Sequence, residues 1–104
     1  EPLSPVIVWQ DSRSESLCKS RTKHAGRIRE LSGLENDPYF VAPKIRWLAD
    51  NYGSDSTITT LDTWLIAKLT KEFVTDISTA SRSMLLNLQT HLSLIFQQPR
   101  EVCY

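Results

Sequence analysis

The stretch from Asp37 to Asn51 restricts the fold more than any other, because it joins a proline turn to a helix that begins with a proline. Pro38 favours an extended conformation for the residue before it, and Pro43 suits the first turn of a helix, where an N–H group is not needed. Tyr39 and Phe40 are therefore expected on a rigid loop at the start of a helix. Loops held by a rigid element often carry binding residues.

The size and charge of the chain exclude several classes of protein. With 104 residues it can form one small domain with a modest core. Lys plus Arg and Asp plus Glu both number 12, so net charge gives no reason to expect a nucleic-acid or membrane partner. No apolar run approaches the roughly 20 residues of a membrane-spanning helix. Cys18 and Cys103 have neither metal-ligand spacing nor the density of a disulfide framework, so we expect reduced thiols and a cytoplasmic location.

Two short segments have the composition of β-strands. Val6–Trp9 is an apolar, β-branched run bounded by a proline and polar residues, which predicts a buried strand, and Thr57–Thr60 could form a second one. Two short strands alone make a sheet that is barely stable in water. The chain is therefore expected to be part of something larger.

The remaining patterns predict helices around this pair of strands. One begins at Ser12 or Ser14 and ends at Gly33, and another starts at Thr60 or Asp62 with its apolar residues in the core. The strongest periodicity starts after Thr75 or Asp76 and runs from Ile77 to Leu88. It continues through Leu92, Ile95 and Phe96 to Pro99, either as one long helix or as two with a turn near Gln89-Thr90. Together with the helix after Pro43, the chain is predicted to contain three or four helices.

Single residues and short motifs do not indicate an enzyme. His24 and His91 lie far apart and have no metal-ligand spacing, and three glycines cannot supply a phosphate-binding glycine loop. The basic residues from Lys19 to Arg29 fall around a helix without interleaved aromatics, which favours a solvated surface over a nucleic-acid site.

Four segments, read together, change this picture. Val8–Arg13 reads Val-Trp-Gln-Asp-Ser-Arg, and Asp37–Leu48 places an Asp-Pro-Tyr-Phe loop before a Lys-x-x-Trp helix. Leu61–Thr70 contains Asp-Thr-Trp-Leu, and Val74–Leu85 contains Thr-Asp followed by Ala-Ser-Arg. In this order the four segments resemble the FGGY family of carbohydrate kinases, most closely its glycerol kinase-like branch.

The resemblance implies a fold and a reaction. Family members have two ribonuclease-H-like (actin-like ATPase) domains and transfer the γ-phosphoryl group of ATP, with Mg²⁺, to a hydroxyl of a polyol or sugar. Residues 1–104 would form a partial N-terminal kinase domain, an incomplete α/β piece that is mostly helical with two short strands. Its partners would be a small polyol or sugar substrate and either the remainder of the kinase or a second copy of the chain.

The same resemblance assigns site residues. Trp9 and Tyr39 match positions that line the substrate pocket, and an indole and a phenol suit the carbon chain and hydroxyls of a polyol. For Trp9 a role in the core at a strand end remains open. Nothing matches the family's phosphate loop or catalytic aspartate, so no catalytic, cofactor-binding or metal residue is expected, and the chain alone is expected to be inactive. The alternative is a non-catalytic helical interaction module that uses the face from Ile77 to Leu88.

Overall fold

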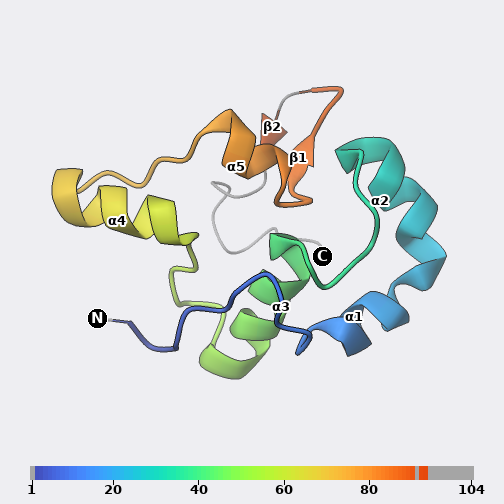
Figure 1. Cartoon of the computed structure of the whole chain (residues 1–104), viewed down its shortest axis with the longest axis horizontal. Coiled ribbons are helices and arrows are strands. Elements are labelled where there is room, and N and C mark those ends of the chain that lie inside the picture. The colour runs from blue at the N-terminus through green and yellow to red at the C-terminus, as the bar shows by residue number, and fades with distance from the viewer. Residues whose placement is uncertain (1, 91, 94–104) are drawn as a thin grey trace.

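The computed structural model describes residues 2–90, 92 and 93, and these residues are mostly helical (Figure 1). A central helix, α3, lies between α4 on one side and the pair α1 and α2 on the other. The one β-ladder among the described residues pairs β1 with β2 in antiparallel register, with Leu86 opposite Ser93. The elements in chain order are α1 (Glu15–Ser20), a 3₁₀ helix η1 (Thr22–His24), α2 (Ala25–Ser32), α3 (Val41–Tyr52), α4 (Leu61–Thr70), α5 (Ile77–Ser81), β1 (Leu86–Asn87) and β2 (Leu92–Ser93).

Both predicted strands are wrong. Val6–Trp9 and Thr57–Thr60 run without strand pairing in the structure, and Val6, Val8 and Trp9 are exposed. The β-branched composition was right for a strand, but a strand needs a neighbour, and no described segment pairs with either run. The strands that do form, β1 and β2, lie where a helix was predicted.

The region predicted as one helix up to Gly33 forms in pieces. Ser14 precedes the first turn of α1, as predicted, but the helix stops at Ser20, where its apolar face weakens, and η1 redirects the chain into α2. Gly33 ends α2 with φ of 71°, the left-handed conformation that favours glycine. A Cβ at this position would lie 2.9 Å from Leu88 Cδ1, so the end of α2 and the β1 turn are in close contact.

The helix after the aromatic loop forms as predicted, and it carries the core. α3 begins at Val41, which places Pro43 in its first turn. Ala42 packs with Met84 and Leu85 as the buried centre. The partly buried side chains of Ile28, Leu34, Phe40 and Ile45 pack around it. The Ala42 N–H also donates to the Ser83 carbonyl at 2.9 Å, which joins the start of α3 to the chain after α5.

The helix from Leu61 begins after Thr60, as predicted, but its apolar residues are not in the core. Leu61, Leu65 and Leu69 are 59%, 52% and 76% exposed, and Thr63 is the buried residue of α4. The Thr63 hydroxyl donates to the Val74 carbonyl at 2.9 Å, so α4 is anchored through a polar contact. The prediction of a buried apolar face for this helix is wrong in the described structure.

The long helix from Ile77 to Leu88 is also wrong. Asp76 caps its start as predicted, because its carboxylate accepts from the Thr79 N–H at 2.9 Å. α5 then ends at Ser81, and Met84 adopts a left-handed conformation with φ of 64°, which a continuing helix cannot contain. Met84 and Leu85 are buried all the same. Ile95, Phe96, Pro99 and Cys103 lie outside the described residues.

The surface of the molecule agrees with the solvated interpretation of the basic stretch. Lys19 pairs with Glu15, Arg27 with Glu30, and Arg29 with Glu35, all through exposed side chains. Among the residues that the structure describes, none of the helices has the length and apolarity needed to cross a bilayer. Cys18 is free and buried, and this burial raises the pKa of its thiol.

Candidate functional site

The aromatic loop before α3 is a tight turn held by its own first residue. The Asp37 carboxylate accepts from the Tyr39 N–H at 2.7 Å, and the Asp37 carbonyl accepts from the Phe40 N–H at 3.2 Å. Such a turn needs Asp or Asn at its first position and is stiffened by the proline that follows. The rigid loop expected from the sequence therefore forms, and it presents the Tyr39 side chain at the surface.

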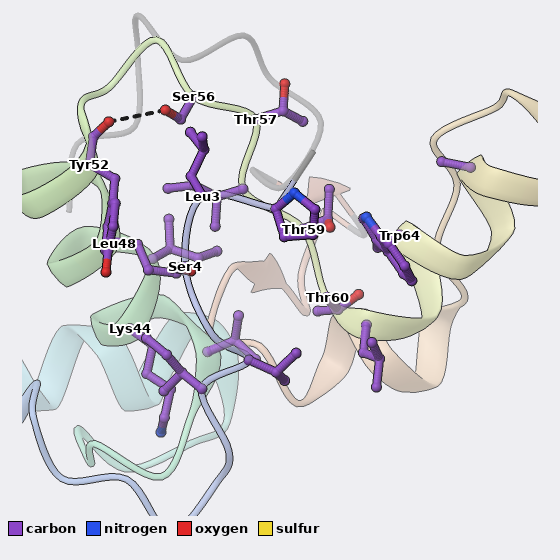
Figure 2. Close-up of a pocket in the computed structure, with 18 of the residues that line it drawn as sticks. Leu3, Ser4, Lys44, Leu48, Tyr52, Ser56, Thr57, Thr59, Thr60 and Trp64 are labelled. Atoms are coloured by element: carbon purple, nitrogen blue, oxygen red, sulfur yellow. Dashed lines mark hydrogen bonds between the residues drawn. The ribbon is translucent and has the colours of Figure 1, made fainter.

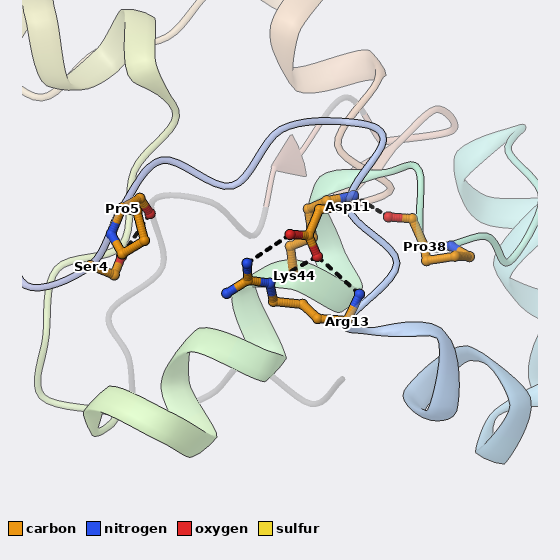
Figure 3. A network of polar contacts seen from close by, with 6 residues as sticks. All are labelled: Ser4, Pro5, Asp11, Arg13, Pro38 and Lys44. Carbon is orange, nitrogen blue, oxygen red and sulfur yellow. Dashed lines mark hydrogen bonds and ion pairs between the residues drawn. The ribbon is translucent and has the colours of Figure 1, made fainter.

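A buried lysine on α3 holds this loop in place. Lys44 is 6% exposed, and its ammonium donates to the Pro38 carbonyl (Figure 3). It also donates to the Tyr39 carbonyl at 3.1 Å. Burial lowers the pKa of Lys44, and the negative charges of Asp11 and Asp37 act in the opposite direction. The loop conformation thus depends on a side chain one helical turn into α3.

The turn that carries Trp9 is held by polar contacts of Asp11 and meets α3 through Arg13. The Asp11 N–H donates to the Val8 carbonyl at 3.1 Å, and the Asp11 carboxylate accepts from Arg13 Nε at 2.8 Å (Figure 3). The hydrogen bonds from the Arg13 side chain and backbone lower the pKa of Asp11 to about 2. The Arg13 guanidinium also lies 4.8 Å from the centre of the Trp47 ring, a cation–π contact with α3.

These two turns bring the predicted site residues together. The rings of Trp9 and Tyr39 lie 5.6 Å apart between centroids with planes at 56°, and Phe40 meets Tyr39 edge to face at 5.0 Å. Trp9 is 61% exposed and Tyr39 is 39% exposed, so both rings have surface left for a ligand. The alternative role of Trp9 in the core at a strand end is wrong.

A third residue completes this cluster and was not assigned a role from the sequence. Arg82 Nη2 donates to the Tyr39 hydroxyl at 3.0 Å, and the guanidinium carbon lies 5.5 Å from the Tyr39 ring centre and 5.9 Å from that of Phe40. Arg82 and Tyr39 are 43 positions apart, so no local spacing connects them. The Ala-Ser-Arg motif was the available signal, and only the fold shows where its arginine lies. We call Trp9, Tyr39 and Arg82 the aromatic site.

A groove in the described structure lies away from the aromatic site. It has a volume of about 840 Å³ and lies between the N-terminal segment, α3 and α4, and Trp9 and Tyr39 do not line it. Figure 2 shows Leu3, Leu48 and Trp64 at this groove, and a hydrogen bond of 3.1 Å from the Ser56 hydroxyl to the Tyr52 carbonyl beside it. Its apolar lining is more typical of a surface that packs against protein than of a polyol site.

The arrangement can bind but contains little that could catalyse. The carboxylates nearest the aromatic site are engaged: Asp11 pairs with Arg13, and Asp37 caps its own turn. In residues 2–90, 92 and 93, no three metal-ligating side chains gather. What the site offers a ligand is an apolar wall, a phenol hydroxyl and one cation.

Comparison with known proteins gives consistent matches. A model of the N-terminal domain of the FGGY family of carbohydrate kinases matches residues 1–92. Glycerol kinase of Mycoplasmoides gallisepticum is 40% identical over 97% of this chain, and glycerol kinase 2 of Streptomyces coelicolor is 42% identical over 86%. The chain covers 23% and 20% of those two proteins, so it spans about a fifth of their length. The crystal structure of Plasmodium falciparum glycerol kinase with ADP matches 89% of this chain with a TM-score of 0.80 at 34% identity, over 21% of its own chain.

Proposed function

Because the chain belongs to the FGGY family of carbohydrate kinases, we propose that it forms part of an ATP-dependent kinase that phosphorylates a polyol or sugar. In this proposal residues 1–104 are a piece of the N-terminal, ribonuclease-H-like domain and supply part of the substrate-pocket wall. The observation that carries the proposal is the contact between Trp9 and Tyr39. These residues come from different segments, and their ring centroids lie 5.6 Å apart. A cytoplasmic location stays a prediction.

The aromatic site suits the chemistry of a small polyol. The exposed indole of Trp9 can cover the carbon chain, and the Tyr39 hydroxyl can hydrogen-bond a substrate hydroxyl. ATP and Mg²⁺ would supply the phosphoryl group and neutralise its charge in a complete family enzyme. The carboxylates of Asp11 and Asp37 do not fit Mg²⁺, since they are already engaged by Arg13 and by the Tyr39 N–H. The role of this chain is therefore to bind and orient substrate, and the chain alone is expected to be inactive.

Titration calorimetry tests the proposal directly. Glycerol, xylitol and ribitol would be titrated into a chimera in which this chain replaces the matching part of a complete FGGY kinase. Tyr39→Ala should weaken binding by about 10-fold or more, because it removes both the ring and its hydroxyl. Tyr52→Ala is the matched control, since Tyr52 is also 39% exposed but lies at the groove. Unchanged affinity after Tyr39→Ala would remove Tyr39 from the site.

A second candidate function is a non-catalytic interaction module derived from such a kinase. The face from Ile77 to Leu88 cannot serve as one helix, because α5 ends at Ser81. The exposed leucines of α4 and the apolar groove beside it are the surface that would be used, with a second copy of the chain as partner. Sedimentation at several concentrations tests this candidate: association that is lost in Leu65→Asp would support it, and a monomer at every concentration would exclude it.

A further inference from the structure

We propose that Arg82 is a positioning residue that makes the Tyr39 hydroxyl a hydrogen-bond donor toward the bound polyol. This inference rests on the proposed function, and it adds a residue and a direction to the substrate contact. It starts from the hydrogen bond of 3.0 Å between Arg82 Nη2 and Tyr39 Oη.

The chemistry of the two groups sets the direction of this bond. A guanidinium only donates, whereas a phenol hydroxyl has one proton to donate and lone pairs that accept. The Tyr39 oxygen must therefore be the acceptor from Arg82, and its own proton is left for another oxygen. Without this contact the hydroxyl could rotate and serve either as donor or as acceptor. With it, the site selects a ligand oxygen that can accept.

The position of Arg82 is determined by the packed part of the fold. The carbonyl of the next residue, Ser83, accepts from the Ala42 N–H at the start of α3. The Ser83 side chain is buried, donates to the Ala80 carbonyl at 2.6 Å and accepts from the Leu85 N–H at 3.0 Å. The backbone beside Arg82 is thus held by Ser83, and its guanidinium lies over the rings of Tyr39 and Phe40.

The charge of Arg82 adds a second selection. Within the described part of the chain, Arg82 has no carboxylate within ion-pair distance. A ligand with an ammonium group near Tyr39 would meet this positive charge and would have no lone pair for the Tyr39 proton. The aromatic site should therefore prefer glycerol to its amine analogue 2-amino-1,3-propanediol, which is a cation at neutral pH.

A double-mutant cycle in the same chimera that is used for calorimetry tests the proposal. Glycerol and the amine analogue would be titrated while the Trp9 indole N–H signal is followed by NMR. Arg82→Met and Tyr39→Phe should each weaken glycerol binding by about 5-fold, the value of one hydrogen bond. The double variant should bind as Tyr39→Phe does, because Arg82 acts through the hydroxyl. Preference for glycerol over the amine should fall in Arg82→Met. Arg46→Met, an exposed arginine on α3, is the control and should bind normally.

Each other outcome overturns the proposal. If Arg82→Met weakens binding further in the Tyr39→Phe background, the arginine acts through general stability. If Arg82→Met leaves binding unchanged, it positions nothing. If the unmodified chimera binds no glycerol, the polyol contact that the proposed function assigns to Tyr39 fails and this inference with it. A ligand-free measurement separates that case: slow rotation of the Arg82 guanidinium that is lost in Tyr39→Phe shows that the contact exists and that the choice of ligand was wrong.

Discussion

α3 and α4 have similar apolar content but different surroundings. α3 buries Ala42, Pro43 and Lys44 and touches the aromatic loop, the Asp11 turn and the chain after α5. α4 buries Thr63 and leaves its leucines to solvent and to the groove. Propensity and capping can form a helix, but only a packed partner turns its apolar face into core. α3 has such a partner among the described residues, and α4 does not.

The difference also separates two kinds of contact with the proposed site. α3 positions Tyr39 through Lys44, and the chain joined to α3 positions Arg82. α4 touches neither. We therefore expect substitutions in the core beside α3 to disturb the aromatic site. Substitutions in α4 should leave the aromatic site unchanged.

The largest expected effect comes from truncating a leucine in the core beside α3. Leu85 is 5% exposed, so Leu85→Ala should lower the free energy of unfolding by about 2–4 kcal/mol through lost burial and a cavity. The matched variant Leu65→Ala on α4 should change it by less than about 0.5 kcal/mol, because that side chain is already half in water. Urea unfolding measures both. Equal losses in the free energy of unfolding would mean that α4 is packed in solution and would contradict the difference between the two helices.

A smaller effect is expected at the residues that end α2 and α4. Gly33→Ala should destabilise by about 2 kcal/mol, since an L-residue resists φ of 71° and the new Cβ meets Leu88. Lys71 ends α4 with φ of 67°, so Lys71→Gly should stabilise that end by about 0.5–1 kcal/mol. Gly26→Ala is the control, because a Cβ there meets nothing within 4 Å. Amide hydrogen exchange shows whether each change stays within its own helix.

The smallest effect is the acid dependence of the Asp11 turn. The pKa of Asp11 is lowered from 3.8 to about 2 in the folded chain, so the unfolded chain binds the proton more readily. The stability that this carboxylate contributes is complete above pH 4 and is lost as the pH falls from about 4 to about 2. Urea midpoints measured across this range should vary less in Asp11→Asn. Part of the acid dependence should remain, because the Thr79 N–H also lowers the pKa of Asp76.

The sequence predicted features that depend on near neighbours better than features that depend on distant segments. The proline turn, the start of α3, the Gly33 stop and the Asp76 cap depend on neighbours within about four residues, and all of them form as predicted. The strand at Val6–Trp9 and the buried face of α4 needed partners from elsewhere and do not form. The left-handed Met84, which lies after the end of α5 and is incompatible with a longer helix, gave no signal, because methionine has no preference for that conformation.

The site divides in the same way. Trp9 and Tyr39 were predicted through motif resemblance, and the structure places them in contact. The loop is held by Lys44, a contact that no sequence pattern indicated, while Trp47 meets Arg13 and Tyr52. Arg82 is joined to Tyr39 across 43 positions, a distance that no periodicity can bridge.

Lys44 has a consequence for how this surface can evolve. Its ammonium holds two consecutive carbonyls of the aromatic loop, those of Pro38 and Tyr39, and the cost of its burial is partly offset by the charges of Asp11 and Asp37. Substitutions at these three positions should therefore show epistasis, since each alters the background in which the other two are tolerated. Trp9 and Tyr39 lie in different loops, yet we expect substitutions in these two loops to be correlated. Lys44, which couples the two loops, does not need to contact a ligand for this effect.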